Sequence, residues 1–249
     1  MDARPVGFFD SGRGGLCVRE AFRKVCPKES TVYVADTAHC PYGNRPAAEI
    51  VRLSEANYRT LVTKHGCKMV VVACNTATAA AIDVLRAKHP ETPFIGLEPA
   101  VKPAALRSKT GVVGVLATAG TFSGRLYNET KAKFAKDVTV IAAVADEFVT
   151  LVEELKGEKV ETLTGARAAR VEAAVRKRIE PLLAAGADHI VLGCTHFPHL
   201  KSVIEKVSGG RAAVLDPSDA VARQAKRVLA DRGLATDATD EPTHVFISA

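Results

Sequence analysis

The clearest indication of the fold class is the stretch Met69-Val70-Val71-Val72-Ala73-Cys74-Asn75-Thr76. Its first five residues are apolar on both faces and rich in valine, which is typical of a parallel strand covered by helices on both sides. The apolar run then stops at three polar residues, and residues 77–89 have the composition of a helix. The stretch therefore predicts a buried strand that ends in a polar turn and leads into a helix.

The same unit recurs along the chain. Short apolar runs alternate with longer amphipathic stretches, and such alternation favours an α/β protein built on mainly parallel sheets. We expect helices over residues 46–66, across most of 148–185, where Gly186 would end the helix, and over 220–232. The expected strands cover residues 6–9, 31–35, 69–73, 94–97, 111–117, 138–143, 189–193, 212–215 and 244–247.

The pattern restarts near residue 111, and the two halves are alike. Ile190-Val191-Leu192-Gly193-Cys194-Thr195-His196 resembles the first stretch, and both end in a cysteine followed by polar residues. We predict two pseudo-symmetric α/β lobes, residues 1–97 with 213–249 and residues 98–212. Because ligands bind at the carboxyl ends of parallel strands, we expect the active site in a cleft between these lobes.

Composition limits the possible functions. The 249 residues carry a net charge of +6, contain six cysteines, and are 47% hydrophobic, which suits a globular protein with a real core. No export signal and no membrane-length apolar run are visible, so we expect a cytoplasmic protein with reduced thiols and no membrane partner. Basic residues in 125–136 and 167–178 interleave with Ala, Glu and Val, which indicates solvated helix faces rather than a nucleic-acid platform.

Cys74 and Cys194 are the strongest chemical signal. Each follows a buried strand, where backbone N–H groups and a helix start favour the reactive thiolate. His196, two residues after Cys194, could relay that thiol's proton. Two thiols on facing lobes could address opposite sides of one carbon, which is what inversion of a stereocentre requires. Cys17, Cys26, Cys40 and Cys67 show no metal-ligand spacing, and we expect no metal site.

Two further segments carry weaker signals. Asp10-Ser11-Gly12-Arg13-Gly14-Gly15 is a glycine-rich turn after a strand, which is suited to holding an anion. It lacks both the dinucleotide-binding and the P-loop spacing. The segment Asp36 to Asn44 contains a strand-end aspartate and a Pro-Tyr-Gly turn.

Taken together, these motifs resemble the cofactor-independent glutamate racemases of the aspartate/glutamate racemase superfamily. The matching pieces follow the family's order over nearly the whole chain: residues 9–15, 36–43, 72–78, 114–121, 148–153 and 192–198. The resemblance implies two α/β lobes, an amino-acid racemase that needs no cofactor, and a supply of D-glutamate for peptidoglycan. We also expect a homodimer.

The resemblance further implies roles for single residues. Cys74 would serve the D-isomer and Cys194 the L-isomer, with Asp10 assisting the first thiol and His196 the second. The residues implied to hold the substrate's amine and carboxylates are Asp10, Ser11, Tyr42, Gly43, Asn75, Thr76, Thr118, Thr195 and His196. Asp36, Thr121 and Glu153 match supporting positions.

One departure leaves alternatives open. The family usually has Cys-Pro shortly before the helix that ends at Glu153, and this chain has Ala145-Asp146, which adds a carboxylate near the expected site. Side-chain selectivity is therefore open, and a racemase of aspartate or another acidic amino acid is an alternative. A non-catalytic amino-acid-binding regulatory protein is another. A single-thiol decarboxylase or isomerase is disfavoured, because both Cys-containing strand ends are present.

Overall fold

The computed structural model describes residues 2–249, which form two compact units. The first contains residues 2–97 and 218–249, and the second contains residues 98–217. The expected boundary at 212/213 differs from the observed one at 217/218, because the strand over residues 213–215 pairs with a strand of the second unit.

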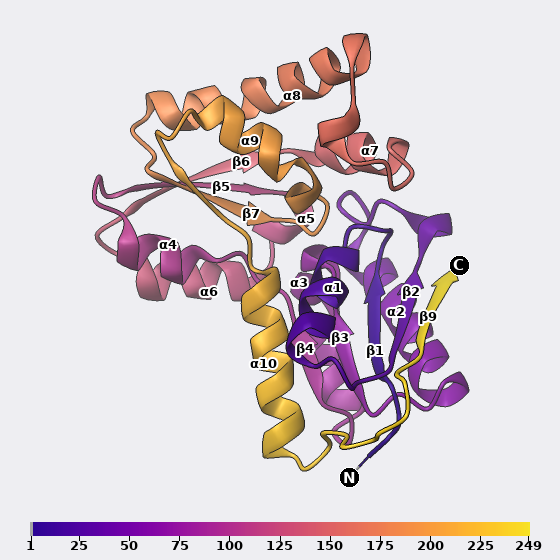
Figure 1. The fold of residues 1–249 in the computed structure, drawn as a ribbon. Helices are drawn as coiled ribbons and strands as arrows, with labels where there is room; N and C mark the ends of the chain where they lie inside the picture. Colours follow the sequence, from indigo (N-terminus) through magenta and orange to yellow (C-terminus); the bar gives the residue numbers. More distant parts are fainter. Residues whose placement is uncertain (1) are drawn as a thin grey trace. The chain divides into compact units, whose positions relative to one another are not determined.

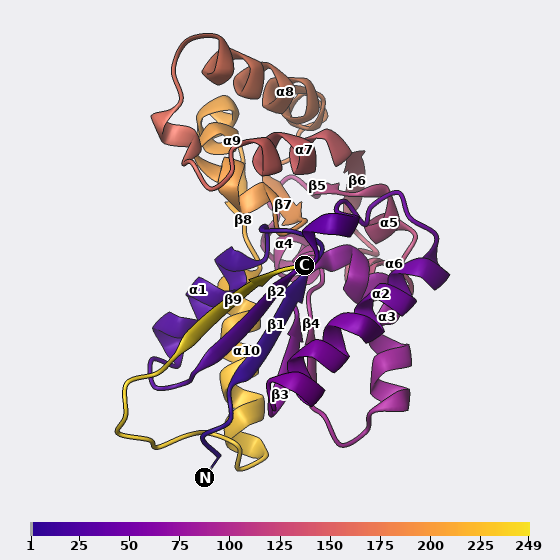
Figure 2. The ribbon, with the colours of Figure 1, turned by 90° about the vertical axis from the view of Figure 1, so that its right-hand side faces the viewer.

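The first unit is built on a five-stranded parallel sheet in the order β4-β3-β1-β2-β9. Its strands are β1 (Val6–Asp10), β2 (Thr31–Ala35), β3 (Met69–Val72), β4 (Phe94–Gly96) and β9 (His244–Ser248). Figure 2 shows β9, from the end of the chain, lying along β2. Strands β1 and β3 are buried along their whole length, as their apolar runs predict.

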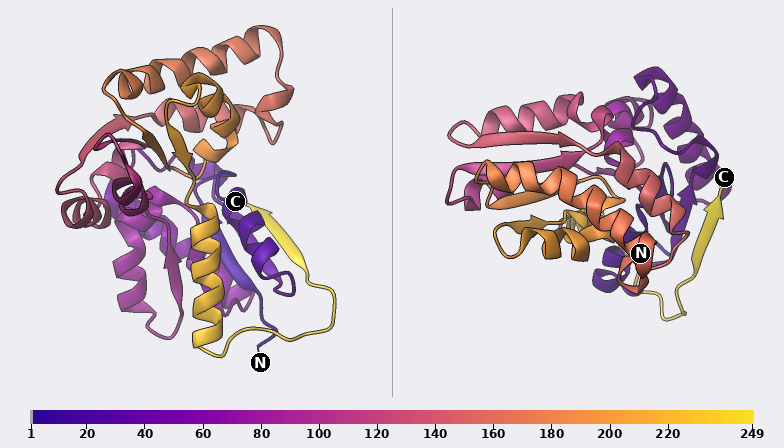
Figure 3. Two further views of the ribbon diagram at one scale, coloured as in Figure 1. Left: turned by 60° about the vertical axis from the view of Figure 1, so that its left-hand side comes forward. Right: turned by 90° about the horizontal axis from the view of Figure 1, so that it is seen from above.

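Helices cover both faces of this sheet (Figure 1). One layer consists of α1 (Leu16–Val25) and α10 (Ser218–Asp231), which pack together against Phe8, Tyr33 and Val71. Figure 3 shows these two helices in its left view. The other layer consists of α2 (Ala47–Arg59), its continuation η2 (Thr60–Lys64) and α3 (Asn75–Lys88). The short helix η1 (Thr37–His39) follows β2.

The second unit has a four-stranded parallel sheet in the order β6-β5-β7-β8. Its strands are β5 (Val112–Ala117), β6 (Thr139–Val144), β7 (His189–Gly193) and β8 (Ala213–Leu215). Helices α4 (Val101–Arg107) and α6 (Arg125–Phe134) contribute to a core with β5 and β7. On β5, a Cβ at Gly114 would lie 2.7 Å from the side chain of Leu182, which belongs to the helix α8 (Gly165–Ala184), so this helix packs directly on the sheet.

The helical stretch expected across most of residues 148–185 is present, and it is divided into three elements. The long helical region predicted over residues 148–185 consists of α7 (Asp146–Glu154), η3 (Val160–Thr162) and α8 (Gly165–Ala184). As predicted, Gly186 terminates α8: it directly follows the C-cap residue Ala185 and has φ +87°. Shorter elements are α5 (Ala119–Phe122), η4 (Phe197–Leu200) and α9 (Lys201–Ser208). The predicted α/β class with parallel sheets flanked by helices is confirmed.

Candidate active site

The carboxyl ends of β1 and β3 bring Asp10, Ser11 and Cys74 together in the first unit. Asp10 is fully buried, and its Oδ2 accepts a hydrogen bond of 3.0 Å from the Gly15 N–H. The Sγ of Cys74 lies 4.0 Å from the Ser11 hydroxyl oxygen. The sequence placed these residues at the ends of two strands, and the structure shows that these strands, β1 and β3, pair in parallel, which brings the residues close together.

Cys74 is the N-cap residue of α3. Its Sγ accepts a hydrogen bond from the Ala77 N–H at 3.4 Å, and the residue is 5% exposed. A sulfur atom at a helix N-terminus faces backbone N–H groups and the positive end of the helix dipole. Such groups can stabilise a thiolate, which is the form that a proton-abstracting sulfur takes.

Asn75 and Thr76 form the first turn of α3 behind Cys74, and both are buried. The Asn75 Nδ2 donates to the Leu97 carbonyl at 3.4 Å. Its Oδ1 is buried and accepts no hydrogen bond from residues 2–249. A buried amide oxygen without a donor is costly, so a ligand amine is a suitable partner for it.

The turn at residues 10–15 is held in place by Tyr33. Its phenol donates to the Gly12 carbonyl at 3.0 Å, and burial together with the nearby Asp10 raises the pKa of Tyr33. A Cβ at Gly15 would lie 2.6 Å from the Ala73 carbonyl oxygen, so only glycine allows this close approach. The turn is therefore fixed by packing against β3 and by one phenol.

Asp36, Tyr42 and Gly43 belong to a second buried cluster of the first unit. The Tyr42 phenol donates to the Asp36 Oδ2, and burial and this hydrogen bond raise the pKa of Tyr42. His39 Nδ1 lies 2.7 Å from the other Asp36 oxygen, and Asn57 Nδ2 donates to the Tyr42 oxygen at 3.2 Å. Asp36 thus fixes the segment after β2, while Gly43 is buried beside Tyr42.

Sequence reasoning missed Asn57 and gave His39 no role in this cluster. Asn57 occupies a buried position of α2, and the signal available in the sequence was an amide at the helical spacing of the apolar residues Ile50 and Leu53. His39 is three residues from Asp36, a spacing that becomes informative only once η1 is known to be helical.

In the second unit, Cys194 follows β7 and lies beside His196. The distance from the Cys194 Sγ to the His196 Nδ1 is 3.8 Å, and the two residues are 8% and 1% exposed. The His196 Nε2 lies 2.7 Å from the Glu153 Oε1. The structure therefore joins three predicted residues in one row, Glu153, His196 and Cys194.

This row is suited to proton transfer. A carboxylate at one imidazole nitrogen orients the ring and stabilises its protonated form, while the other nitrogen faces the sulfur. Glu153 comes from α7 and Cys194 from the end of β7, so the pairing depends on the packing of α7 against η4.

Three buried threonines complete the predicted set in this unit. The Thr118 and Thr121 hydroxyl oxygens lie 3.0 Å apart after β5, and Thr195 directly follows Cys194. Strands β5 and β7 are neighbours, so their carboxyl ends lie side by side. The hydroxyls can donate to a carboxylate or accept from an amine.

Asp146 holds α5 and α7 together. It is the first residue of α7, and its Oδ1 accepts a hydrogen bond of 3.4 Å from the Ala119 N–H at the start of α5. Partial burial raises the pKa of Asp146 above its usual value. Asp146 therefore ties the start of α7, the helix that carries Glu153, to the segment after β5.

Comparison with known proteins identifies the family of this chain. Residues 16–225 match the model of the Asp/Glu/hydantoin racemase family, and the chain belongs to this family. The family and the fold thus define the chain as a racemase, an enzyme of the isomerase class.

Individual relatives are more specific. A glutamate racemase from Herpetosiphon aurantiacus is 44% identical over 97% of this chain and 91% of its own length. The structure of glutamate racemase isoform RacE1 from Bacillus anthracis matches with a TM-score of 0.86 at 30% identity, over 100% of this chain and 89% of that one. The Escherichia coli glutamate racemase, solved with L-glutamate and an activator, matches with a TM-score of 0.84 at 31% identity, over 98% and 89% of the two chains.

Proposed function

We propose that this chain interconverts L- and D-glutamate by moving a proton between Cα and two thiols. The observation that carries the proposal is that two buried cysteines each lie at the carboxyl end of an inner strand. Cys74 lies beside the Ser11 hydroxyl, and Cys194 lies beside the His196 imidazole. The glutamate specificity is supported by relatives that are named glutamate racemases and match nearly the whole chain.

The proposed reaction uses the thiols in opposite roles. One thiolate removes the Cα proton from its side of the substrate, and the other thiol returns a proton from the far side. Cys194 serves L-glutamate and is assisted by His196 and Glu153, while Cys74 serves D-glutamate and is assisted by Asp10. Each turnover exchanges the protonation states of the two sulfur atoms, and the reverse reaction restores them.

The difficult step is removal of the weakly acidic Cα proton. A free thiol has a pKa of about 8.5, so the abstracting sulfur needs stabilisation as a thiolate. At Cys74 the α3 N–H groups provide it. Fixed donors around the substrate carboxylate would stabilise the carbanion-like transition state without reorganising during the reaction.

The polar residues around the thiols are proposed to bind the substrate. In the first unit these are Ser11, Asn75, Thr76 and the Tyr42-Gly43 turn, and Asp36 supports that turn through Tyr42. In the second unit they are Thr118 and Thr195, with Thr121 holding Thr118. Together they offer hydroxyl and amide groups for one amine and two carboxylates.

The proposal extends to the cellular context. Both thiols must stay reduced, which favours the cytoplasm, and all six cysteines are free in the structure. Among residues 2–249, no helix is both long and apolar enough to cross a membrane. We further propose a homodimer and a role in supplying D-glutamate for peptidoglycan.

Circular dichroism with L-glutamate and L-aspartate as separate substrates tests the function. Loss of the L-glutamate signal toward zero, with a much slower change for L-aspartate, is the expected result. Faster racemisation of aspartate would assign another acidic substrate. Tight binding of glutamate with no deuterium uptake at Cα in D2O would instead identify a non-catalytic binding protein.

A further inference from the structure

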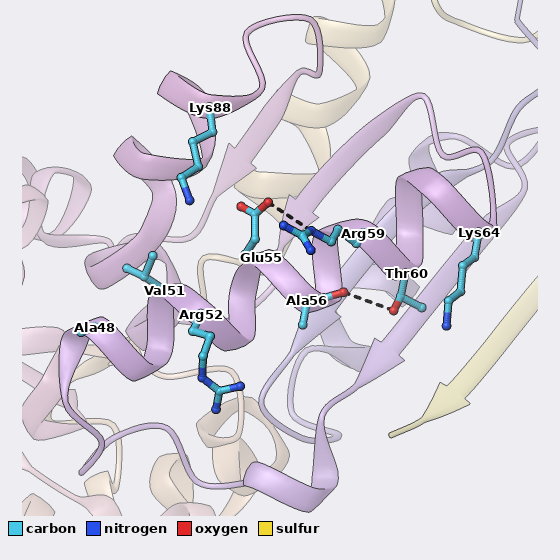
Figure 4. Close-up of a pocket in the computed structure, with 9 residues that line it drawn as sticks. All are labelled: Ala48, Val51, Arg52, Glu55, Ala56, Arg59, Thr60, Lys64 and Lys88. Atoms are coloured by element: carbon cyan, nitrogen blue, oxygen red, sulfur yellow. Dashed lines mark hydrogen bonds and ion pairs between the residues drawn. The ribbon is translucent and has the colours of Figure 1, made fainter.

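A groove on the first unit lies away from the strand ends that carry Cys74. Its volume is about 600 Å3, and it runs along the outer side of α2 and η2 next to the end of α3 (Figure 4). The lining residues are Ala48, Val51, Arg52, Glu55, Ala56, Arg59, Thr60, Lys64 and Lys88. Four of these nine side chains are cationic and one is anionic, so the groove is strongly basic.

The single carboxylate of the groove is already occupied. Glu55 pairs with Arg59 at 3.5 Å, and its oxygens lie 3.1 and 3.2 Å from the His89 Nε2. Arg52, Lys64 and Lys88 make no hydrogen bond or ion pair with any residue in 2–249. Three exposed cations therefore border one groove with no protein partner.

The π-helical turn that continues α2 explains how Lys64 comes to line the groove. In a regular helix, residues 52, 56, 59, 60 and 63 would share one face. The chain instead forms a π-helical turn over Thr60–Lys64, which inserts one residue into the periodicity. As a result Lys64 lines the groove and Thr63 does not. Such π turns often occur at functional sites, and here the turn extends a row of positive charge.

The row of cations along α2 and its π turn runs from Arg52 to Lys64. Arg52 and Lys64 are twelve residues apart, which corresponds to roughly 18 Å along the helix axis. In Figure 4, Arg52, Arg59 and Lys64 follow one another along this axis, while Lys88 extends from α3 toward it. Between them, Ala48, Val51 and Ala56 are small enough to leave the groove open.

The chemistry of the ligand follows from these features. A single exposed ion pair contributes only about 0–1 kcal/mol, so one carboxylate or one phosphate would not stay bound. An elongated anion with several charges gains from all four cations at once. Arginine forks match phosphate oxygens in a bidentate manner, and lysines act as point charges for the same group.

We propose that this groove binds a linear polyphosphate chain that spans the row from Arg52 to Lys64. The site is separate from the proposed racemase site and does not depend on its chemistry. The groove contains no aromatic side chain on which bases could stack, which disfavours single-stranded nucleic acid as the ligand.

Binding of pyrophosphate and of long-chain inorganic polyphosphate to the full-length protein, measured by titration calorimetry, tests the proposal. We expect the long chain to bind at least about tenfold more tightly than pyrophosphate, and to weaken steeply with salt. Equal affinities for the two probes, or no binding of the long chain, would overturn the proposal. Tighter binding of a single-stranded oligonucleotide of equal charge would overturn it as well.

Two sets of variants locate the site. Arg52→Gln combined with Lys64→Gln should weaken polyphosphate binding about tenfold. The control is Arg223→Gln combined with Lys226→Gln, which removes the same number of exposed charges from α10 and should change binding less than twofold.

The exchange Thr63→Lys with Lys64→Thr keeps composition and net charge but moves the cation off the groove. It should weaken binding severalfold, and wild-type affinity in this exchange variant would contradict the proposed register.

Discussion

Single residues decide the proposed chemistry, and the two thiols matter most. Replacing Cys74 or Cys194 by alanine should abolish racemisation, because each removal leaves one side of Cα without an acid or base. Stopped-flow or steady-state circular dichroism on purified variants measures this directly. Cys74→Ser keeps an acceptor for the Ala77 N–H and separates loss of chemistry from loss of the helix cap. Normal turnover by either alanine variant would refute the two-thiol mechanism.

Glu153 is a positioning residue in this account. Glu153→Gln removes the negative charge beside the His196 Nε2 and should lower kcat/KM about tenfold or more. Because enantiomers have an equilibrium constant of one, kcat/KM must fall equally in both directions. The pH–rate profile should also change, which a purely structural role would not produce.

The neighbouring glutamate provides the control for this experiment. Glu154 pairs with Arg170 at 2.7 Å on the surface, so Glu154→Gln removes the same charge from the same helix without touching His196. An equal loss of activity in both variants would mean that Glu153 does not act through His196.

The positions of single residues could be predicted from the sequence where a residue directly follows a strand. Asp10, Cys74 and Cys194 could be placed because parallel strands present their carboxyl ends at one edge. Asn57 could not, because its contact with Tyr42 joins residues fifteen positions apart through a loop whose conformation the sequence does not reveal.

At the scale of elements, Asp188 links the start of β7 to the loop before β5. Its carboxylate accepts hydrogen bonds from Ser108 Oγ at 2.8 Å and from the Lys109 and Thr110 N–H groups at 2.6 and 3.0 Å, and it also contacts His189. Burial opposes ionisation, but these donors hold the pKa of Asp188 well below its usual range.

This depressed pKa gives a pH-dependent prediction. Stabilisation from a carboxylate whose folded pKa is lowered is present above its unfolded pKa of about 3.9 and is lost as the pH falls below that value. Asp188→Asn should therefore unfold at lower denaturant concentration than the wild type at pH 7, and the difference should shrink as the pH falls below about 4. A difference in unfolding midpoint that does not depend on pH would contradict this explanation.

Element boundaries show where the sequence was insufficient. The apolar runs predicted β1, β2, β3 and β7 to within a residue, because their burial dictates their composition. The π turn at residues 60–64 and the break between α7 and α8 were not predicted. Both interrupt stretches with helical composition, and only tertiary packing determines where such stretches break.

At the scale of the whole molecule, the chain forms two units, each a parallel sheet with helices on its faces and one thiol at a strand end. The restart of the pattern near residue 111 predicted this organisation. The residue at which the chain returns from the second unit to the first was harder to predict. The reason is that Ala213–Leu215 is a short strand whose composition would suit either sheet.

In the proposed mechanism, two different groups handle the proton on the two sides of Cα. The most direct test is the isotope content of both enantiomers at low conversion of L-glutamate in D2O, read by mass spectrometry after chiral separation. We expect the D-glutamate formed to carry deuterium at Cα, while the remaining L-glutamate keeps its protium. D-glutamate that retains the substrate's own protium would show return of the same proton by one group and would contradict the two-thiol mechanism.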